Sequence, residues 1–356
     1  MAEFKFDKNF NPGAFKDRFD SRDYQYEPLA SAIGEEAFDW EKGFDIEEEL
    51  GIKLKVENQN GSSSCVGQAT HKYGEVLELV ENKKLPDFSA KWVYAQIHLP
   101  NGGAYCRDAC KVATGQGFAL EKDLPSYTTV EMSDGKIVYN APTEEFITKS
   151  EDITQEIRQK ALPYKGLKYY SVRADIDLVA QAIKNHWGLL MAARGSNLGW
   201  REPKGIVRPP KSGENQWGHA IFGLGAKMLN GKKAIRFINS WSENWGDKGY
   251  CWFTEDYFNS GNMYSSWVII DQKNINLIKP MRLVKTNDSS TVYMIDLKGY
   301  RRAFYDKQHF DSVAPLVSET KFITENDGKT DWSKVETITK EEMDKLPLGR
   351  PLWLVD

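Results

Sequence analysis

The chain has little of what marks a secreted disulfide scaffold, a membrane protein or a nucleic-acid-binding protein. Four cysteines in 356 residues are too few for a disulfide framework. The net charge of −4 gives no broad basic field, which argues against a nucleic acid or an anionic membrane as partner. The longest apolar run, residues 188–193, is far shorter than a membrane span, and residues 1–7 lack the apolar core of a signal peptide. We therefore expect an intracellular or packaged globular protein.

A Gly- and Ser-rich turn carries a glutamine and a cysteine six positions apart, Gln59 and Cys65. A Gly-His pair at His219 and an Asn-Ser-Trp run beginning at Asn239 follow far downstream. A cysteine nucleophile needs an imidazole that holds it ionised and later protonates the leaving group, and a polar side chain that fixes the imidazole tautomer. The Gln59 amide and the backbone N–H of Cys65 can donate to a tetrahedral oxyanion. The candidate catalytic residues are therefore Gln59, Cys65, His219 and Asn239.

Cys65 is expected at the start of a buried helix. The apolar positions that follow it recur at helical spacing, and Ser63 or Ser64 is a suitable N-cap. The unpaired N–H groups and the dipole at such a helix start favour the thiolate. A small buried cysteine without chemistry is the alternative interpretation, but it gives no reason for the downstream His219 and Asn239 motifs.

Together these motifs resemble those of the papain-like cysteine peptidases, in particular of bacterial and phage members. The family has a Gln six positions before a helix-starting Cys, a later Gly-His, and an Asn-Ser-Trp run followed by Trp-Gly and Gly-Tyr, which stand here at Trp245 and Gly249. The resemblance covers about residues 35–272. The features shared with bacterial and phage members lie at residues 20–26, 38–40, 107–109, 117 and 124–125.

The resemblance implies an α+β papain-like fold, with a helical half, a β-sheet or barrel half and a cleft between them. It implies a peptidase that hydrolyses peptides or proteins through a Cys65 thioester and needs no metal or organic cofactor. Gly102 and Gly103 are the expected substrate-backbone site, since glycines allow a substrate strand to approach closely. Trp241 is expected beside the catalytic histidine, at the substrate-binding surface.

Two departures from the family pattern concern the nucleophile loop. Ser62 stands where many secreted members carry a Cys, and Val66 replaces the Trp that usually follows the nucleophile. The usual disulfide near the active site cannot form, so we expect a reducing compartment and a cytoplasmic or phage-associated protein. Cys106 and Cys110 are four positions apart and could ligate a metal. No Cys-x-x-Cys or His pair accompanies them, so buried free thiols and no metal site are expected.

Hydrophobic periodicity places helices in the first half of the expected catalytic domain and strands in the second. Further helices are expected at residues 90–99, 107–117, 144–161 and 176–186. Strands are expected at residues 168–172, 189–194, 219–228, 232–239, 250–254 and 266–270. Both halves that the fold requires are therefore present.

The hairpin near residue 230 determines whether His219 and Asn239 share a face of the sheet. A two-residue loop would put the two residues on opposite faces, because side chains alternate along a strand. A three-residue loop, residues 229–231, shifts the register by one and sets His219 opposite Trp241 with Asn239 as its diagonal neighbour. We therefore predict the three-residue loop or an equivalent bulge.

Two terminal pieces flank the expected catalytic domain, residues 35–274. Residues 1–34 are too short for the long helical propeptide of many family members, and we expect a packing strap, with a cleft-blocking segment as the alternative. Residues 280–356 are similar to a small β-rich module appended to bacterial surface and phage proteins. A protein or surface partner and a purely stabilising cap both remain open for this module. Its strands are expected at residues 281–285, 291–296, 300–304, 332–335 and 346–349.

Three functions are compatible with these motifs. The leading one is an active thiol endopeptidase. The second is a transpeptidase or wall-crosslink hydrolase with the same cysteine and histidine, whose cleft would exclude water or admit D-amino acids. The third is a virion or assembly scaffold that uses an inactive peptidase fold. A scaffold would not need Gln59, Cys65, His219 and Asn239 together, which favours an enzyme.

Overall fold

The structure is a computed structural model that describes most of the chain. The described residues are 13–20, 23–32, 35–59, 61–131, 137–140, 142–201, 203–270, 282–295, 300–304, 307, 310, 332 and 335–348. The chain divides into two compact units. The larger unit comprises Met1–Phe19 and Phe38–Asp271, and the smaller unit comprises Asp20–Ala37 and Gln272–Asp356. The domain boundaries expected from the sequence stay a prediction.

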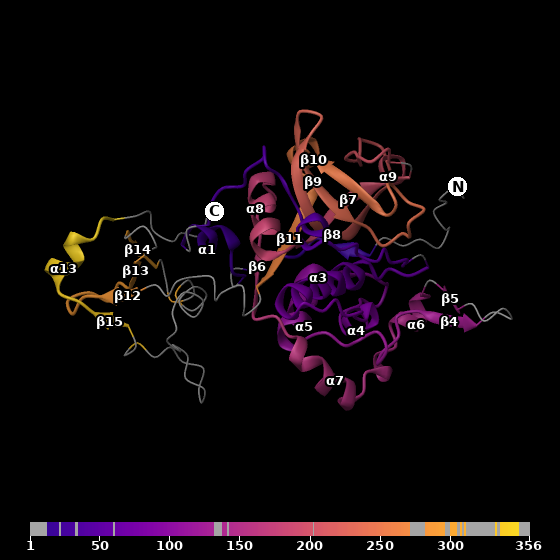
Figure 1. Ribbon diagram of the computed structural model, residues 1–356, viewed down its shortest axis with the longest axis horizontal. Helices are drawn as coiled ribbons and strands as arrows, with labels where there is room; N and C mark the ends of the chain where they lie inside the picture. Colours follow the sequence, from indigo (N-terminus) through magenta and orange to yellow (C-terminus); the bar gives the residue numbers. More distant parts are fainter. Residues whose placement is uncertain are drawn as a thin grey trace. The chain divides into compact units, whose positions relative to one another are not determined.

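The larger unit has a helical half and a sheet half (Figure 1). Its helices are α2 (Ile46–Leu50), α3 (Cys65–Asn82), α4 (Ala90–Tyr94), α5 (Cys106–Gly115), α6 (Glu144–Ile147), α7 (Gln155–Ala161), α8 (Ile176–His186), α9 (Asn197–Trp200) and α10 (Glu255–Asn259), with 3-10 turns at Ser150–Asp152 and Leu162–Tyr164. Its strands are β1 (Ala14–Phe15), β2 (Phe44–Asp45), β3 (Ala104–Tyr105), β4 (Thr128–Glu131), β5 (Ile137–Asn140), β6 (Lys168–Ser171), β7 (Leu189–Ser196), β8 (Gln216–Leu229), β9 (Lys232–Ile238), β10 (Tyr250–Thr254) and β11 (Met263–Ile270). In Figure 1, α3, α4, α5 and α7 lie together below strands β7 to β10. The predicted α+β architecture is confirmed.

Helix α3 carries the cysteine and packs against α4, α5 and strand β8. Every residue from Cys65 to Leu77 is buried, as predicted for this helix. Ser64 stands at the N-cap, but its side chain makes no capping bond; its hydroxyl instead lies 2.7 Å from that of Ser62. The helix ends at Lys83, which adopts the left-handed conformation. The cysteine therefore begins a helix whose first three turns are completely buried.

The main sheet supports the histidine. Its strand order is β10-β9-β8-β7-β11-β6, with β2 also paired to β8, and neighbouring strands run antiparallel. Helices α3 and α8 both contact β8, and the middle of this strand is continuously buried. A strand that is covered in this way needs apolar residues at successive positions, as the run 219–226 has.

Strands β8 and β9 are joined by a two-residue turn. Its residues, Asn230 and Gly231, have φ angles of 51° and 76°, the positive values that a type I′ turn requires. Leu229 pairs with Lys232 across the turn. The predicted three-residue loop is therefore wrong, because the Asn-Gly pair closes the tighter hairpin whose twist matches that of the strands.

A β-bulge further along the same hairpin corrects the register. The pairing shifts by one residue between Gly223 and Gly225, so that Phe222 faces Ile238. The alternative form of the prediction, an equivalent bulge, is confirmed. Because side chains alternate, this one-residue shift brings His219 to the same face as the residue that follows β9, Asn239.

Two predicted helices of the larger unit are shorter or interrupted. The helix expected at 90–99 ends at Tyr94. The helix expected at 144–161 is divided into α6, a 3-10 turn and α7, because Thr143 and Thr154 each cap a separate helix start. The hairpin of β4 and β5 lies outside the expected strands. The other predicted helices and strands of this unit are confirmed, with ends that differ by a few residues.

The smaller unit is a β-rich module with its own core. Its elements are α1 (Tyr26–Ala32), β12 (Arg282–Lys285), β13 (Tyr293–Ile295), β14 (Arg301–Ala303), β15 (Glu336–Thr337) and α13 (Lys340–Lys345), and its sheet has the order β14-β13-β12-β15. Val284, Ile338 and Met343 form the core. The strands predicted at 281–285, 291–296 and 300–304 are confirmed by β12, β13 and β14. The strands predicted at 332–335 and 346–349 fall partly outside the described residues.

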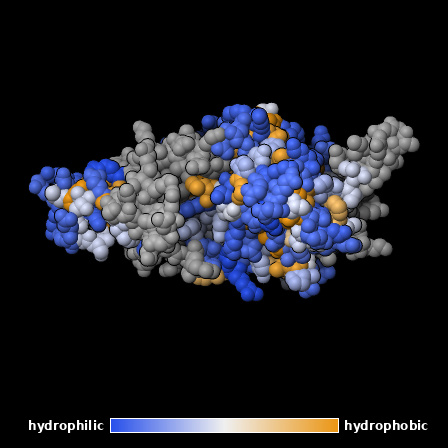
Figure 2. Space-filling model, turned by 90° about the horizontal axis from the view of Figure 1, so that it is seen from below, coloured by the Kyte–Doolittle hydropathy of each residue, from blue (hydrophilic) through white to orange (hydrophobic). Residues whose placement is uncertain are grey.

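The larger unit presents a mainly polar face in Figure 2, and its apolar side chains lie mainly inside. Over the larger unit, the face in Figure 2 is mainly hydrophilic, and its hydrophobic residues form small separate patches. Among the described residues, no helix combines the length and the apolar character needed to cross a membrane. The apolar side chains of this unit are used mainly in its core, which the helical and sheet halves share.

Candidate active site

Cys65 is the first residue of α3 and is fully buried. Backbone groups of Ala220, Gly13 and Val66 lie close enough to its sulfur to favour the thiolate and so lower the pKa of the thiol. Burial nevertheless raises the pKa of the Cys65 thiol to about 11, so the cysteine is protonated at neutral pH in this form. The thiolate expected from the helix start is not the resting form, because desolvation outweighs the favourable helix N-terminus.

His219 lies on β8, directly before the Ala220 that contacts the sulfur. Its Nε2 lies 2.7 Å from the side-chain oxygen of Asn239, and the same oxygen accepts the backbone N–H of Ser240 at 2.8 Å. An oxygen that accepts both bonds requires the proton on Nε2, which leaves Nδ1 as the basic nitrogen. Within the described residues, Nδ1 has no hydrogen-bond partner. Burial lowers the pKa of His219 to about 4, so the imidazole is neutral.

Three tryptophans surround the imidazole. The ring of Trp241 lies 4.5 Å from that of His219 at an interplanar angle of 35°, whereas Trp200 and Trp217 meet it edge-on at 5.7 and 6.1 Å. Apolar rings exclude water and so strengthen the hydrogen bond between His219 and Asn239. The sequence indicates Trp241 through its Asn-Ser-Trp motif, but no spacing rule indicates Trp200 or Trp217.

Gln59 is held against the segment that follows Asn239. Its side-chain oxygen accepts the Ser240 hydroxyl at 2.5 Å, and its side-chain nitrogen donates to the Ser62 carbonyl at 3.2 Å. The backbone N–H of Gln59 donates to the Ser240 carbonyl at 2.8 Å. Because the oxygen is already bonded, the amide presents its nitrogen toward the Cys65 loop, as an oxyanion donor must. The structure thus brings the predicted residues together from four separate segments.

Residues 36–270 match the papain family of cysteine proteases. The chain belongs to the papain family. A curated relative of this papain-family protein, described as a cysteine protease of Blomia tropicalis, is 21% identical over 253 residues, which are 70% of this chain and 71% of the relative. The resemblance inferred from the motifs is therefore confirmed, and the chain is a cysteine peptidase that acts on peptides or proteins.

Solved structures agree with this assignment. Xylellain, a cysteine protease from Xylella fastidiosa, superposes with a TM-score of 0.59 at 23% identity over 75% of this chain and 98% of that protein. The procathepsin B S9 of Trypanosoma congolense superposes with a TM-score of 0.52 at 15% identity over 73% of this chain and 86% of that protein. At these identities the similarity establishes the papain-like fold.

The N-terminal segment of this papain-family peptidase lies on the nucleophile. Strand β1 pairs in parallel with β3, Ala14 opposite Ala104, and the Ala104 N–H donates to the Gly13 carbonyl at 2.7 Å. The Tyr264 hydroxyl donates to the Ala14 carbonyl at 2.8 Å. Gly218, next to the histidine, leaves room for this segment, since a Cβ there would lie 1.9 Å from the Ala14 carbonyl oxygen. Residues 13–15 thus cover the site from the β3 edge to the Gly-His strand.

Asp17 anchors this segment. One carboxylate oxygen accepts the Arg107 N–H at 3.2 Å, and the other accepts the Trp267 indole N–H at 2.8 Å. The Asp17 N–H donates to the Ser265 hydroxyl at 3.3 Å. Burial raises the pKa of Asp17, although these donors oppose the shift. The sequence gives no signal for these contacts, because a single Asp in a polar N-terminal stretch has no distinctive spacing.

Gly102 and Gly103 form the turn before β3, with φ angles of 82° and 78° that favour glycine. The Gly103 N–H donates to the Tyr94 hydroxyl at 2.7 Å, and its carbonyl accepts the Leu99 N–H at 2.8 Å. Both backbone groups of Gly103 are therefore used inside the protein. The group that pairs with an extended segment is the N–H of Ala104, the next residue. The role expected for the two glycines in substrate binding stays a prediction.

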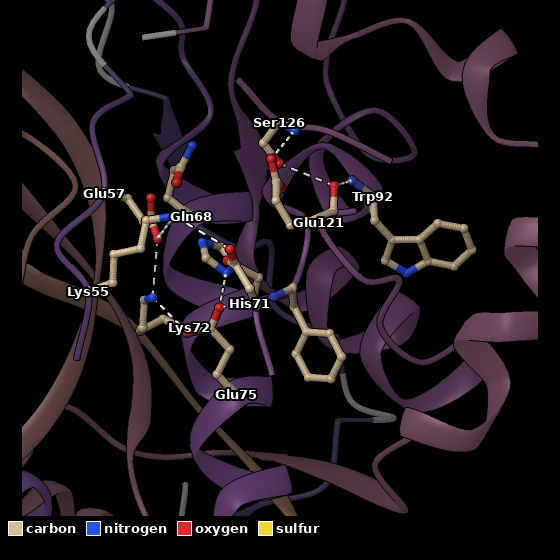
Figure 3. Close-up of polar contacts among 12 residues, drawn as sticks. Lys55, Glu57, Gln68, His71, Lys72, Glu75, Trp92, Glu121 and Ser126 are labelled. Atoms are coloured by element: carbon tan, nitrogen blue, oxygen red, sulfur yellow. Dashed lines mark hydrogen bonds and ion pairs between the residues drawn. The ribbon is translucent and has the colours of Figure 1, made fainter. Parts of the chain in front are cut away.

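A buried charged cluster joins helix α3 to Glu57 (Figure 3). The Lys72 ammonium is 2.6 Å from the Glu75 carboxylate and 3.3 Å from that of Glu57, and all three side chains are buried. His71 Nδ1 lies 3.1 Å from Glu75. Burial alone would raise the pKa of Glu75, but Lys72 and His71 outweigh it and lower that pKa to about 2. Since Glu57 stands two positions before Gln59, the cluster ties the oxyanion segment to helix α3.

The remaining cysteines have no part in this site. Cys106, Cys110 and Cys251 are buried and form no disulfide, as expected for the first two. Burial raises the pKa of the Cys106 thiol well above its ordinary value and that of Cys251 to about 12. Among the described residues, no three His, Cys, Asp or Glu side chains are grouped as metal ligands. Of the four cysteines, Cys65 is therefore the one that lies at the candidate active site with Gln59, His219 and Asn239.

Proposed function

We propose that the chain hydrolyses peptide bonds through a thioester on Cys65, with His219 as base and acid, Asn239 as its orienting partner and Gln59 in the oxyanion hole. The observation that carries this proposal is the 2.7 Å bond from His219 Nε2 to Asn239, which leaves Nδ1 basic on the strand that contacts the sulfur. The tautomer is the one that general-base catalysis needs.

The reaction proceeds in two acyl transfers. First, Nδ1 of His219 takes the thiol proton and the Cys65 sulfur attacks the peptide carbonyl carbon. The oxyanion accepts bonds from the Gln59 side-chain N–H and the Cys65 backbone N–H. The C–N bond then breaks, and the imidazolium gives its proton to the leaving amine. Second, Nδ1 takes a proton from water, the hydroxide attacks the thioester, the C–S bond breaks, and the thiolate recovers the proton.

We propose that residues 13–15 keep this site inactive until they move. Three contacts support this proposal: the Gly13 backbone lies against the Cys65 sulfur, the Gly13 carbonyl accepts the Ala104 N–H, and the Ala14 carbonyl lies against Gly218. A substrate strand needs the same edge and the same sulfur. The raised pKa of Cys65 and the lowered pKa of His219 make both groups neutral, which also disfavours attack.

Gly102, Gly103 and Trp241 are proposed to line the path of the substrate strand, next to Ala104 and the imidazole. For the smaller unit we propose a binding role. A pocket of about 410 Å³ supports that role, and Lys285, Asn287 and Trp332 are among the residues that line it. A cation, an amide and an indole together suit a polar ligand with an apolar face.

Turnover of a fluorogenic peptide library tests the proposed hydrolysis. The full chain, the Gly13→Ala variant and Cys65→Ala are compared under reducing conditions. Hydrolysis that increases in Gly13→Ala and disappears in Cys65→Ala is the expected result. Absence of hydrolysis from the full chain and from Gly13→Ala alike would contradict the proposal, as would hydrolysis that survives in Cys65→Ala.

A further inference from the structure

Glu144, the first residue of α6, links the nucleophile loop to the turn before β3. One carboxylate oxygen accepts the Ser63 N–H at 2.5 Å, and the other accepts the Tyr94 hydroxyl at 2.5 Å. The oxygen of that hydroxyl accepts the Gly103 N–H at 2.7 Å. Tyr94 is fully buried and Glu144 is half-buried. A continuous chain of hydrogen bonds therefore joins two segments that flank the sulfur.

Each end of this chain adjoins a group that the proposed reaction uses. Ser63 stands two positions before Cys65, and the other end adjoins Ala104, whose N–H pairs with β1. The nucleophile loop and the turn before β3 approach each other closely at Gly102. A Cβ there would lie 2.9 Å from the Ser63 hydroxyl and 3.3 Å from a Glu144 carboxylate oxygen. The separation between the nucleophile loop and the strand-pairing edge thus depends on Glu144.

Among the described residues, the Ser62 side chain of the nucleophile loop makes only local hydrogen bonds. Ser62 stands where many secreted family members carry a cysteine, so a disulfide cannot hold the loop here. The Ser62 hydroxyl bonds the Gln59 carbonyl at 3.0 Å and the Ser64 hydroxyl at 2.7 Å, which are contacts within the loop itself. The bond from Ser63 to Glu144 instead spans 81 positions. It is charge-assisted, and such bonds are shorter and stronger than neutral ones.

We propose that Glu144 is a positioning residue for the peptidase reaction, which acts through Ser63 and Tyr94 to hold the Cys65 loop in register with the Ala104 edge. The inference rests on the proposed function, because that edge is where a substrate strand would pair. A strand bound there presents its carbonyl to the sulfur only if the loop and the edge keep their spacing, and catalysis is sensitive to displacements of about 1 Å.

Glu144 also acts on Cys65 through its charge. Burial is the main cause of the raised pKa of the Cys65 thiol, and the negative charge of Glu144 adds to it. Glu144→Gln should therefore slow catalysis by loosening the loop and at the same time lower the pKa of the thiol. A variant that is merely less stable would not produce these two effects together.

The test compares Glu144→Gln with Glu145→Gln, the same change at the exposed neighbouring position, both in the full chain. In Glu144→Gln, amide hydrogen exchange at Ser63 and Gly103 is expected to accelerate. In chains that also carry Gly13→Ala, which relieves the proposed block, the value of kcat/KM for a peptide should fall by about 10- to 100-fold, as expected for loss of hydrogen bonds to a charged group. The pH at which iodoacetamide begins to alkylate Cys65 should also shift downward. Glu145→Gln should match the wild type in all three measurements.

Tyr94→Phe provides a second variant. It keeps the carboxylate but removes the hydroxyl, so exchange at Gly103 should accelerate while the alkylation profile of Cys65 stays near that of the wild type. Unchanged exchange at Ser63 and Gly103 in Glu144→Gln would overturn the proposal, as would equal losses in Glu144→Gln and Glu145→Gln. If neither the wild type nor Gly13→Ala hydrolyses a peptide, the proposed function fails, whereas exchange and alkylation, which need no turnover, still decide whether Glu144 holds the loop.

Discussion

The backbone of Gly13 lies against the sulfur of Cys65 and opposes the rise in the pKa of its thiol, so the chain's own N-terminal segment covers this cysteine. The segment also accepts the N–H of Ala104, a backbone group that an extended strand could pair with in the absence of β1. An N-terminal segment that only packed against the domain would not need to contact both the Cys65 sulfur and the Ala104 edge of β3. The cleft-blocking alternative for the N-terminal extension is therefore the one that these contacts favour.

Gly13→Ala is expected to expose the nucleophile. A Cβ at Gly13 would lie 1.8 Å from the Ser63 carbonyl oxygen, so the close contact between residues 13–15 and the Cys65 loop cannot persist. Alkylation of Cys65 by a small thiol reagent should accelerate by about ten-fold or more, because each unit by which the pKa falls gives ten times more thiolate. The matched control is Gly115→Ala, where a Cβ meets nothing within 4 Å. Equal alkylation rates in Gly13→Ala and the wild type would contradict this account.

The pH dependence of that alkylation should move in the same variant. Burial raises the pKa of Cys65 to about 11 and lowers that of His219 to about 4 in the closed form. When the segment leaves, water returns, so the pKa of the thiol falls and the pKa of the imidazole rises. The thiolate is then populated at lower pH. The rate of Cys65 alkylation should be measured over a pH range that includes the pKa values of His219 and Cys65. This rate should begin to rise at a lower pH in Gly13→Ala than in the wild type. Superimposable profiles would disprove the desolvation argument.

Asn239→Ala is expected to lower kcat by roughly ten-fold or more, since the imidazole loses the partner that fixes its tautomer and a buried N–H is left unpaired. Steady-state kinetics on a good peptide substrate measure this effect. Asn244→Ala serves as the control, because Asn244 is an exposed asparagine in the same loop. Equal activity of the two variants would mean that the bond from His219 to Asn239 is structural only.

Gln59→Ala is expected to lower kcat by about 100- to 1,000-fold with little change in KM, because an oxyanion donor acts mainly in the transition state. The exposed Gln159→Ala on α7 is the control. The substitution also removes the bond to the Ser240 hydroxyl, so unfolding should be monitored in parallel. A change confined to KM would assign Gln59 to substrate binding instead.

Lys72→Met is expected to destabilise the fold by about 3–5 kcal/mol, since it leaves the buried carboxylates of Glu57 and Glu75 without their shared cation. Lys111→Met is the control, because its pair with Asp108 is exposed and worth at most about 1 kcal/mol. Denaturant unfolding of both variants measures the difference. Similar losses in the two variants would show that the cluster contributes no more than a surface pair.

The same cluster predicts acid sensitivity of the wild type. The pKa of Glu75 is lowered to about 2 in the folded chain, against an ordinary value of 4.5. The contribution of Glu75 to stability is therefore complete above the ordinary value and is lost as the pH falls through the folded value. Denaturant unfolding at several acidic pH values should show this loss in the wild type and a smaller loss in Glu75→Gln.

The residues proposed to react could be selected from the sequence because their chemistry restricts residue type and spacing. Gln59, Cys65, His219 and Asn239 each stand within a short motif, and the need for His219 and Asn239 to share a face predicts a register shift before any coordinates are known. The form of the shift is harder to predict. The pair Asn230-Gly231 favours the two-residue turn. The bulge lies between Gly223 and Gly225, and these two glycines are the sole sign of its position in the sequence.

The contacts that surround these residues could not be predicted. Gly13 meets Cys65 through backbone atoms, which leave no periodic pattern in the sequence. Glu144 follows a hairpin that the sequence does not indicate, and it reaches Ser63 only because Thr143 starts a new helix there. The charges of Lys72 and Glu75 lie within a buried helix, where a sequence pattern would place them on a solvated face.

The most direct test of the account is labelling with an epoxide-type thiol inhibitor, mapped by mass spectrometry, on Gly13→Ala with and without a second change, His219→Ala. The account predicts that Cys65 is modified far faster than Cys106, Cys110 or Cys251, and that this preference disappears without the imidazole. If Cys65 reacts no faster than the other thiols, or equally fast without His219, the proposed catalytic role of this pair is wrong.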